Sequence, residues 1–243
     1  EIGVRLVGSE MCIRDRCYTT HWRNYMKTDL QSIKDKAIAL LYIEPEPIPE
    51  LPIFLTHPYF ESRAIVLPNS NKFVDIIDDS EALQIVRDDL QAKINSVGSA
   101  EKVFMFLRPQ YRLTLFKYTN QYMSPEDFKE VLLFSWIMVE YPLSDVNVTK
   151  NEMLKWFGKL NFVSDFSGVV TIYRGVGSEK YCDGISWTLA KSKAEWFATR
   201  FTDNGIVYSA KVKSKDILYY ISERDEEEII VDPKKLMQVE RVN

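Results

Sequence analysis

The residues best suited to chemistry lie in the last third of the chain and form three groups. Arg174 ends a strand-like run, and Ser186 and Thr188 lie two residues apart in the next one. Glu226 and Glu228 precede a third run. A guanidinium can hold a phosphate through two hydrogen bonds, and a fixed carboxylate can stabilise a sugar carbon that is losing a substituent. The groups together therefore suit glycosidic cleavage in a phosphate-bearing substrate.

Each group also has an ordinary structural interpretation. An arginine after a strand is commonly solvated, a strand serine can simply face water, and charge runs usually form solvated turns. In an extended segment, Ser186 and Thr188 share one face, and so do Glu226 and Glu228. The order of a cation, a hydroxyl-bearing strand, a helix and then a Glu-x-Glu sequence favours a site over three unrelated features.

This ordered set resembles the arginine-serine-glutamate branch of ADP-ribosyltransferases, which includes cholera-toxin-like and clostridial-type toxins. The resemblance covers about the last seventy to eighty residues. Residues 184–189 and 194–198 are especially similar to phage-associated and mobile-element members. The histidine-containing branch is disfavoured, because His21 and His57 lie outside this region.

The resemblance implies a role for each matching residue. Arg174 would bind the phosphate or ribose of NAD, and the backbone of Gly175 would meet the nicotinamide carboxamide. Ser186 would form a hydrogen bond with Glu228 and fix its rotamer. Glu228 would be the catalytic residue, stabilising the oxocarbenium-like transition state as nicotinamide departs.

The remaining assignments concern the acceptor and the rim of the NAD site. Glu226 would orient or deprotonate the acceptor, and in this family a glutamate here accompanies arginine acceptors. Thr188 would support the floor of the pocket, while Trp187 and Phe197 would pack near nicotinamide. Phe197 also fits the apolar stripe of a helix, so core packing is the favoured alternative for it. Arg200 would supply a second phosphate contact.

The implied function is mono-ADP-ribosylation of a macromolecule with NAD as co-substrate and no metal. Protein is favoured as the acceptor over nucleic acid. The alternatives are an NAD glycohydrolase and an inactive binding module on the same scaffold. The resemblance to mobile-element enzymes implies a bacterial cytoplasmic location, delivery by a phage, and an antitoxin or immunity partner.

Composition narrows the class of protein. The 243 residues carry a formal net charge of -4, which argues against a nonspecific grip on nucleic acid. The histidines and cysteines show no zinc-finger spacing and no disulfide framework. No apolar run is long enough for a transmembrane helix, so no membrane association is expected.

The pattern along the chain predicts an α+β protein with two domains. Residues 1–16 resemble a translated adapter fragment and are excluded from the fold. Residues 17–160 are expected to be mostly helical, with a proline-rich strut at 44–49 as a further boundary. Residues 161–243 are expected to form two packed, mainly antiparallel small sheets with a helix. The expected strands are 169–173, 185–189, 206–212, 217–220 and 229–231.

Capping residues predict where several helices begin. Thr28, Ser80 and Ser124 are expected N-caps, the last followed by Pro125 at the first helical position. Two capping boxes are expected, at 149–152 and 192–195. The second would start the helix that carries Ala194, Phe197, Ala198 and Phe201 on one face.

Overall fold

The computed structural model describes residues 27–138, 147–222 and 226–242, so the segment 1–16 lies outside the described residues. The chain divides into two compact units between Val148 and Thr149, and each is described here by itself. The expected boundary after residue 160 is therefore wrong. Helix α7 (Lys150–Lys159) belongs to the second unit, where its Phe157 ring lies 6.2 Å from the ring of Tyr219.

The first unit combines helices with two short hairpins. Its helices are α2 (Leu30–Leu41), α3 (Ser80–Ser96), α4 (Ala100–Met105), α5 (Pro109–Thr119) and α6 (Pro125–Ile137). The hairpins pair β1 (Glu46–Ile48) with β2 (Leu51–Thr56), and β3 (Ala64–Val66) with β4 (Phe73–Asp75). The strut at 44–49 thus enters a hairpin and is not a boundary, because proline is tolerated in such a short strand.

The N-caps of four helices can be compared with those that the sequence predicts. Ser124 caps α6 and Thr149 forms the expected capping box with Glu152, so both predictions are confirmed. Helices α2 and α3 are instead capped by Asp29 and Asp79, in place of Thr28 and Ser80. Asp29 follows Thr28 and Asp79 precedes Ser80, and in each case the aspartate carboxylate accepts the hydrogen bond from the first helical turn.

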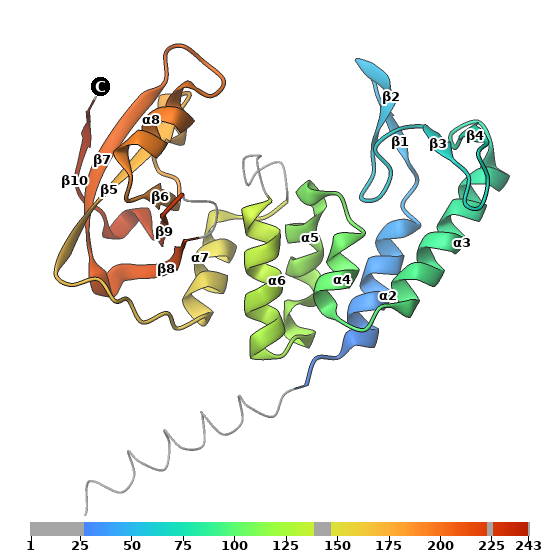
Figure 1. Cartoon of the computed structure of the whole chain (residues 1–243), viewed down its shortest axis with the longest axis horizontal. Coiled ribbons are helices and arrows are strands. Elements are labelled where there is room, and N and C mark those ends of the chain that lie inside the picture. The colour runs from blue at the N-terminus through green and yellow to red at the C-terminus, as the bar shows by residue number, and fades with distance from the viewer. Residues whose placement is uncertain (1–26, 139–146, 223–225, 243) are drawn as a thin grey trace, which may run out of the picture. The chain divides into compact units, whose positions relative to one another are not determined.

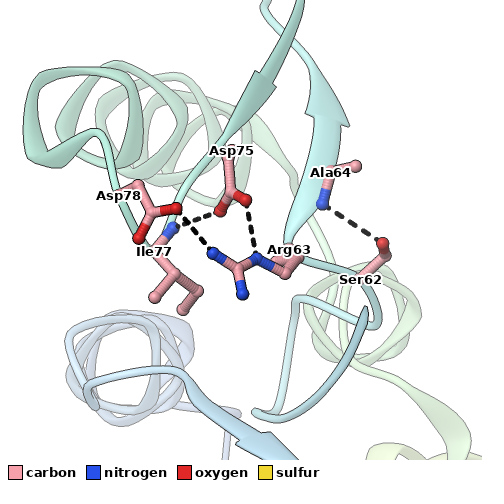
Figure 2. Close-up of polar contacts among 6 residues, drawn as sticks. All are labelled: Ser62, Arg63, Ala64, Asp75, Ile77 and Asp78. Atoms are coloured by element: carbon pink, nitrogen blue, oxygen red, sulfur yellow. Dashed lines mark hydrogen bonds and ion pairs between the residues drawn. The ribbon is translucent and has the colours of Figure 1, made fainter. Parts of the chain in front are cut away.

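An ion-pair network fixes the end of the second hairpin to the start of α3 (Figure 2). The Arg63 guanidinium lies 2.6 Å from the Asp75 carboxylate and 2.7 Å from that of Asp78. The hydrogen bond with Asp75 is the main cause that raises the pKa of Arg63. Asp75 also accepts a hydrogen bond from the backbone N–H of Ile77 at 3.0 Å, so one carboxylate orders both the arginine and the turn.

His57 is a buried structural residue of the first unit. Its Nδ1 accepts hydrogen bonds from the backbone N–H groups of Tyr59 and Phe60, both at 3.1 Å. Its Nε2 lies 3.0 Å from the Ile43 carbonyl oxygen, and its ring stacks on Phe60 at 4.4 Å. A nitrogen that accepts two such bonds carries no proton, so the ring is neutral. Burial lowers the pKa of His57 from 6.5 to about 4.

The second unit is built on one six-stranded sheet (Figure 1). Its strands are β5 (Val169–Val176), β6 (Ser186–Thr188), β7 (Ile206–Lys213), β8 (Ile217–Ile221), β9 (Glu228–Val231) and β10 (Met237–Arg241). The strand order is β10-β7-β5-β6-β9-β8, and each neighbouring pair is antiparallel. The α+β class is confirmed, whereas the expectation of two separate packed sheets is wrong, because hydrogen bonds join all six strands.

The joint between β5 and β6, in the middle of this sheet, is narrow. Among the described residues, β5 and β6 share only the pair Tyr173–Thr188, whereas β5 pairs with β7 along its whole length. A common apolar cluster joins the two halves across this joint: Ile172, Trp187, Ala210, Val212, Ile217, Ile229 and Val231. The sheet therefore opens beside the Tyr173–Thr188 pair while its core stays continuous.

Helix α8 (Lys191–Thr199) packs on β5 and β7 at close range (Figure 1). Ala194 and Ala198 are fully buried against Val207. The capping box at 192–195 is wrong, since α8 begins at Lys191 after Ala190 and has no side-chain cap. The expected apolar face is also shorter, because Phe201 is 81% exposed.

Candidate active site in the cleft between β5 and β6

A cavity of about 220 Å³ lies where β5 and β6 separate. The residues that line it are Tyr173, Arg174, Gly175, Ser186, Trp187, Thr188, Phe197, Glu226 and Glu228. The sequence had singled out all of these except Tyr173. Tyr173 pairs with Thr188 across the joint, and such a pairing partner cannot be read without the strand register.

Arg174 bridges the two strands beside the cavity. Its Nη1 donates to the carbonyl oxygen of Ser186, and its Nε donates to that of Tyr181 at 3.1 Å. Burial lowers the pKa of Arg174, while the nearby Glu228 carboxylate acts to raise it. The guanidinium remains charged at neutral pH, so the cavity holds a fixed cation close to a carboxylate.

Gly184 makes room for this guanidinium, a role that the sequence analysis missed. A Cβ atom at residue 184 would lie 2.1 Å from Nη2 of Arg174 and 2.2 Å from its Cζ. The Gly184 carbonyl also accepts a hydrogen bond from Trp187 Nε1 at 2.9 Å. A glycine ten residues after an arginine gives no local sign of such contact.

Gly175 has a packing role that the sequence did not predict, while its expected backbone contact with nicotinamide stays a prediction. A Cβ at residue 175 would lie 1.7 Å from the carbonyl oxygen of Ala194. The space beside its Cα atom is therefore filled by the backbone of α8. Gly175 still lines the cavity, and its lack of a side chain lets α8 pack on β5.

Strand register decides which hydroxyl faces the carboxylate. Thr188 pairs directly with Glu228 across β6 and β9, whereas Ser186 pairs with Ile230. Directly opposed residues in an antiparallel pair lie closest together, so Thr188 is the immediate neighbour of Glu228. The hydrogen bond expected between Ser186 and Glu228 stays a prediction.

Glu226 and Glu227 do not form the extended segment that the sequence predicts before β9. Glu227 has a φ of 46°, in the left-handed region, and its carbonyl oxygen accepts from Leu189 N–H at 3.1 Å. The Thr188 hydroxyl donates to the Glu226 carbonyl oxygen at 2.6 Å and accepts from Ala190 N–H at 3.1 Å. Thr188 therefore links Glu226 to the start of α8. Glu226 and Glu228 both line the cavity, and Glu227 is exposed outside it.

The aromatic residues divide between core and cavity. Trp187 is only 2% exposed and packs in the apolar cluster with Ile229 and Val231. Its ring therefore supports the floor of the site, and its expected packing near nicotinamide stays a prediction. Phe197 is half-buried and lines the cavity from α8.

Arg200 does not line this cavity. Its guanidinium lies 5.1 Å from the ring centroid of Trp196 and 4.8 Å from that of Phe201. These stacking contacts place it on the outer side of α8. The second phosphate contact assigned to Arg200 gains no support from the arrangement of the described residues.

A second cavity of about 340 Å³ adjoins the first. It is lined by Ser192, Lys193, Trp196, Phe197 and Glu226, so Phe197 and Glu226 belong to both cavities. The sequence analysis missed Trp196 as a site residue. Its spacing of three residues from Lys193 on a helix was the available signal.

Comparison of the chain with protein-family models, with curated proteins and with solved structures finds no match in any of the three. Within residues 27–138, 147–222 and 226–242, no group of three His, Cys, Asp or Glu side chains could hold a metal ion. No helix in that same part of the chain is long and apolar enough to cross a membrane.

The first cavity is therefore equipped for a particular kind of chemistry. Arg174 offers a fixed cation for a phosphate, and Glu228 offers a carboxylate in a partly buried setting. Glu226 lies on the side shared with the second cavity, where it can meet a second reactant. Such an arrangement suits the transfer of a glycosyl group from a phosphate-bearing donor to an acceptor.

Proposed function

We propose that the second unit is a mono-ADP-ribosyltransferase that transfers ADP-ribose from NAD to a macromolecular acceptor and releases nicotinamide. The cleft between β5 and β6 would hold the nicotinamide end of NAD. The single observation that carries the proposal is that Arg174 and Glu228, 54 residues apart in the chain, line one cavity and interact electrostatically. They would have no reason to meet if each were a solvated surface charge.

In this proposal Glu228 accepts a hydrogen bond from the ribose next to nicotinamide and stabilises positive charge on the sugar carbon as the bond breaks. Arg174 holds a phosphate, with its side chain already oriented by the carbonyl oxygens of Ser186 and Tyr181. Because these groups are positioned before the substrate binds, little reorganisation accompanies the reaction. The resemblance of the motif set to the arginine-serine-glutamate ADP-ribosyltransferases supports the same roles.

Glu226 would serve the acceptor by orienting it and taking its proton. Phe197 would separate the donor side from the acceptor side, since it lines both cavities. The motif resemblance favours a protein arginine as acceptor, with nucleic acid as the alternative. It also motivates the further proposals of action in the bacterial cytoplasm, delivery by a phage, and control by an antitoxin or immunity partner.

Replacement of Glu228 tests the proposal. Purified protein is incubated with NAD, and nicotinamide release is followed by chromatography with and without bacterial lysate. Glu228→Gln removes the charge at nearly constant volume, and we expect release to fall by about 10²–10³-fold. Transfer of labelled ADP-ribose to lysate macromolecules should fall equally.

Glu227→Gln is the matched control, because Glu227 is the adjacent acid, is exposed and lines neither cavity. It should retain nicotinamide release close to that of the wild type. Equal release from the Glu228→Gln and Glu227→Gln proteins would contradict the role of Glu228. Nicotinamide release without any labelled macromolecule would identify an NAD glycohydrolase, and absence of NAD binding would indicate an inactive binding module.

A further inference from the structure

The outer face of α8 carries alternating cations and aromatic rings. Lys193, Trp196 and Arg200 are spaced by three and four residues, which places them along one side of the helix. Trp196 is 51% exposed although it is a large aromatic residue. Arg200 lies over its ring at 5.1 Å, and the edge of Phe197 meets it at 4.9 Å. These contacts hold the indole in place while leaving half of its surface open to a ligand.

This face leads directly into the second cavity. Lys193, Ser192 and Trp196 form its outer part, and Glu226 and Phe197 form the part that it shares with the first cavity. A group bound on Trp196 would therefore lie next to Glu226. The lining of the cavity thus includes a cation, a hydroxyl, aromatic rings and a carboxylate.

An unpaired nucleotide complements this set. Its base can stack on Trp196, and its phosphate can pair with Lys193 and Ser192 at the rim, away from the carboxylate. An amino group on the base can donate a hydrogen bond to Glu226. A guanidinium acceptor fits less well, because the Lys193 cation in the same cavity would repel it.

We propose that the second cavity is the acceptor subsite of the enzyme and binds an unpaired nucleotide of a single-stranded nucleic acid. This inference rests on the proposed function and replaces the protein arginine expected from Glu226 alone. The bond between the ribose carbon and nicotinamide breaks, and its electron pair leaves with nicotinamide. The amino nitrogen of the base supplies the pair for the new bond, and Glu226 takes the proton that this nitrogen loses.

The net charge of -4 is compatible with this subsite. This charge argues against nonspecific binding to many backbone phosphates. Recognition at this subsite needs only one stacked base and one phosphate paired with Lys193. Binding is therefore expected to be weak, to depend on unpaired bases and to show a shallow dependence on salt.

The test measures binding directly and needs no NAD. Short fluorescein-labelled oligonucleotides of mixed sequence, as single-stranded DNA, single-stranded RNA and duplex DNA, are titrated with the full chain at several salt concentrations, with anisotropy as the readout. We expect the single strands to bind more tightly than the duplex. Tighter binding of one single strand over the other identifies the acceptor as DNA or RNA.

Trp196→Ala should weaken single-strand binding about tenfold or more, because it removes one stacked base. Trp196→Phe should retain most of the binding and shows that α8 still folds. Lys193→Glu should weaken binding and reduce the slope of log affinity against log salt by about one. Lys215→Glu is the matched control: it makes the same charge change at an exposed lysine outside both cavities, and should leave binding unchanged.

The subsite is refuted if the wild type binds no single strand, or if Trp196→Ala binds as well as the wild type. It is also refuted if a labelled acidic peptide binds more tightly than the oligonucleotides and depends on Lys193 alone. Nicotinamide release by the wild type is measured in parallel with bacterial lysate, with the oligonucleotides and with neither. Absence of release under all three conditions would refute the proposed function and leave the binding result to stand by itself.

Discussion

The replacement Gly184→Ala tests how the cleft holds its cation. A Cβ at residue 184 would lie 2.1 Å from Arg174 Nη2, whereas non-bonded carbon and nitrogen atoms prefer separations of about 3.5 Å. The obstructing atoms belong to one side chain, so the backbone can stay in place. The guanidinium must therefore move by more than about 1 Å. It would then lose its hydrogen bonds to the carbonyl oxygens of Ser186 and Tyr181.

The expected loss of stability follows from the two hydrogen bonds that Arg174 would lose. Hydrogen bonds made by a charged group contribute about 1.5–3 kcal/mol each to stability. Arg174 is half-buried, so water can replace part of this loss, and we expect the free energy of unfolding to fall by about 2–4 kcal/mol. Nicotinamide release should fall by at least about tenfold, because a displaced guanidinium no longer meets the phosphate.

A double-mutant cycle isolates the contact between residues 184 and 174. The Arg174→Ala protein has no guanidinium for the added Cβ to meet. In that protein, Gly184→Ala should lower the free energy of unfolding by less than about 1 kcal/mol. Gly158→Ala is the matched control, because no atom lies within 4 Å of its added Cβ, and in helix α7 it should stabilise by about 1 kcal/mol. Urea denaturation supplies each free energy. The reasoning is refuted if Gly184→Ala costs the same with and without Arg174.

Two further predictions concern a buried ring and a bridging hydroxyl. His57 stays neutral in the folded state down to a pKa of about 4, whereas the unfolded chain takes up the proton near pH 6.5. The free energy of unfolding should therefore be unaffected by His57 above pH 6.5 and fall by up to about 3 kcal/mol as the pH drops toward 4. Denaturation of the wild type and His57→Gln across this range checks it, and parallel pH profiles would disprove it. Thr188→Val removes the hydrogen bond to the Glu226 carbonyl oxygen, so the free energy of unfolding should fall by about 1–3 kcal/mol. Nicotinamide release should fall more in the Thr188→Val protein than in the Ser186→Ala protein. A larger fall in the Ser186→Ala protein would instead identify Ser186 as the residue that positions Glu228.

The sequence singled out residues that line one cavity of the structure. Arg174, Ser186 and Glu228 were found because each lies next to a strand and the strands follow one another in order. Residue type and spacing carry such information, since the chemistry restricts which side chains can serve. Their convergence in one cavity depends on the pairing of β5, β6 and β9, and the structure supplies that pairing.

The misses have physical causes that are not local. Whether Thr188 or Ser186 lies opposite Glu228 depends on the register of β6 and β9, and a shift of two residues would exchange them. The close contacts of Gly175 and Gly184 involve partners 19 and 10 residues away, and a glycine leaves no pattern that points to them. Asp29 and Asp79 displaced the expected caps because two capable residues stood side by side, and local pattern alone could not rank them.

The narrow joint in the sheet has a mechanical consequence. Hydrogen bonds hold strands at fixed spacing, but here one backbone pair, Tyr173 with Thr188, connects three strands on each side. The two halves are also linked by the Arg174 side chain, which donates to the Ser186 carbonyl oxygen, and by a shared apolar cluster, whose contacts have no preferred direction. Small rotations of one half against the other can therefore proceed by sliding of side chains without breaking a ladder. The cleft is compliant in width, while each wall, with its own paired strands, stays stiff.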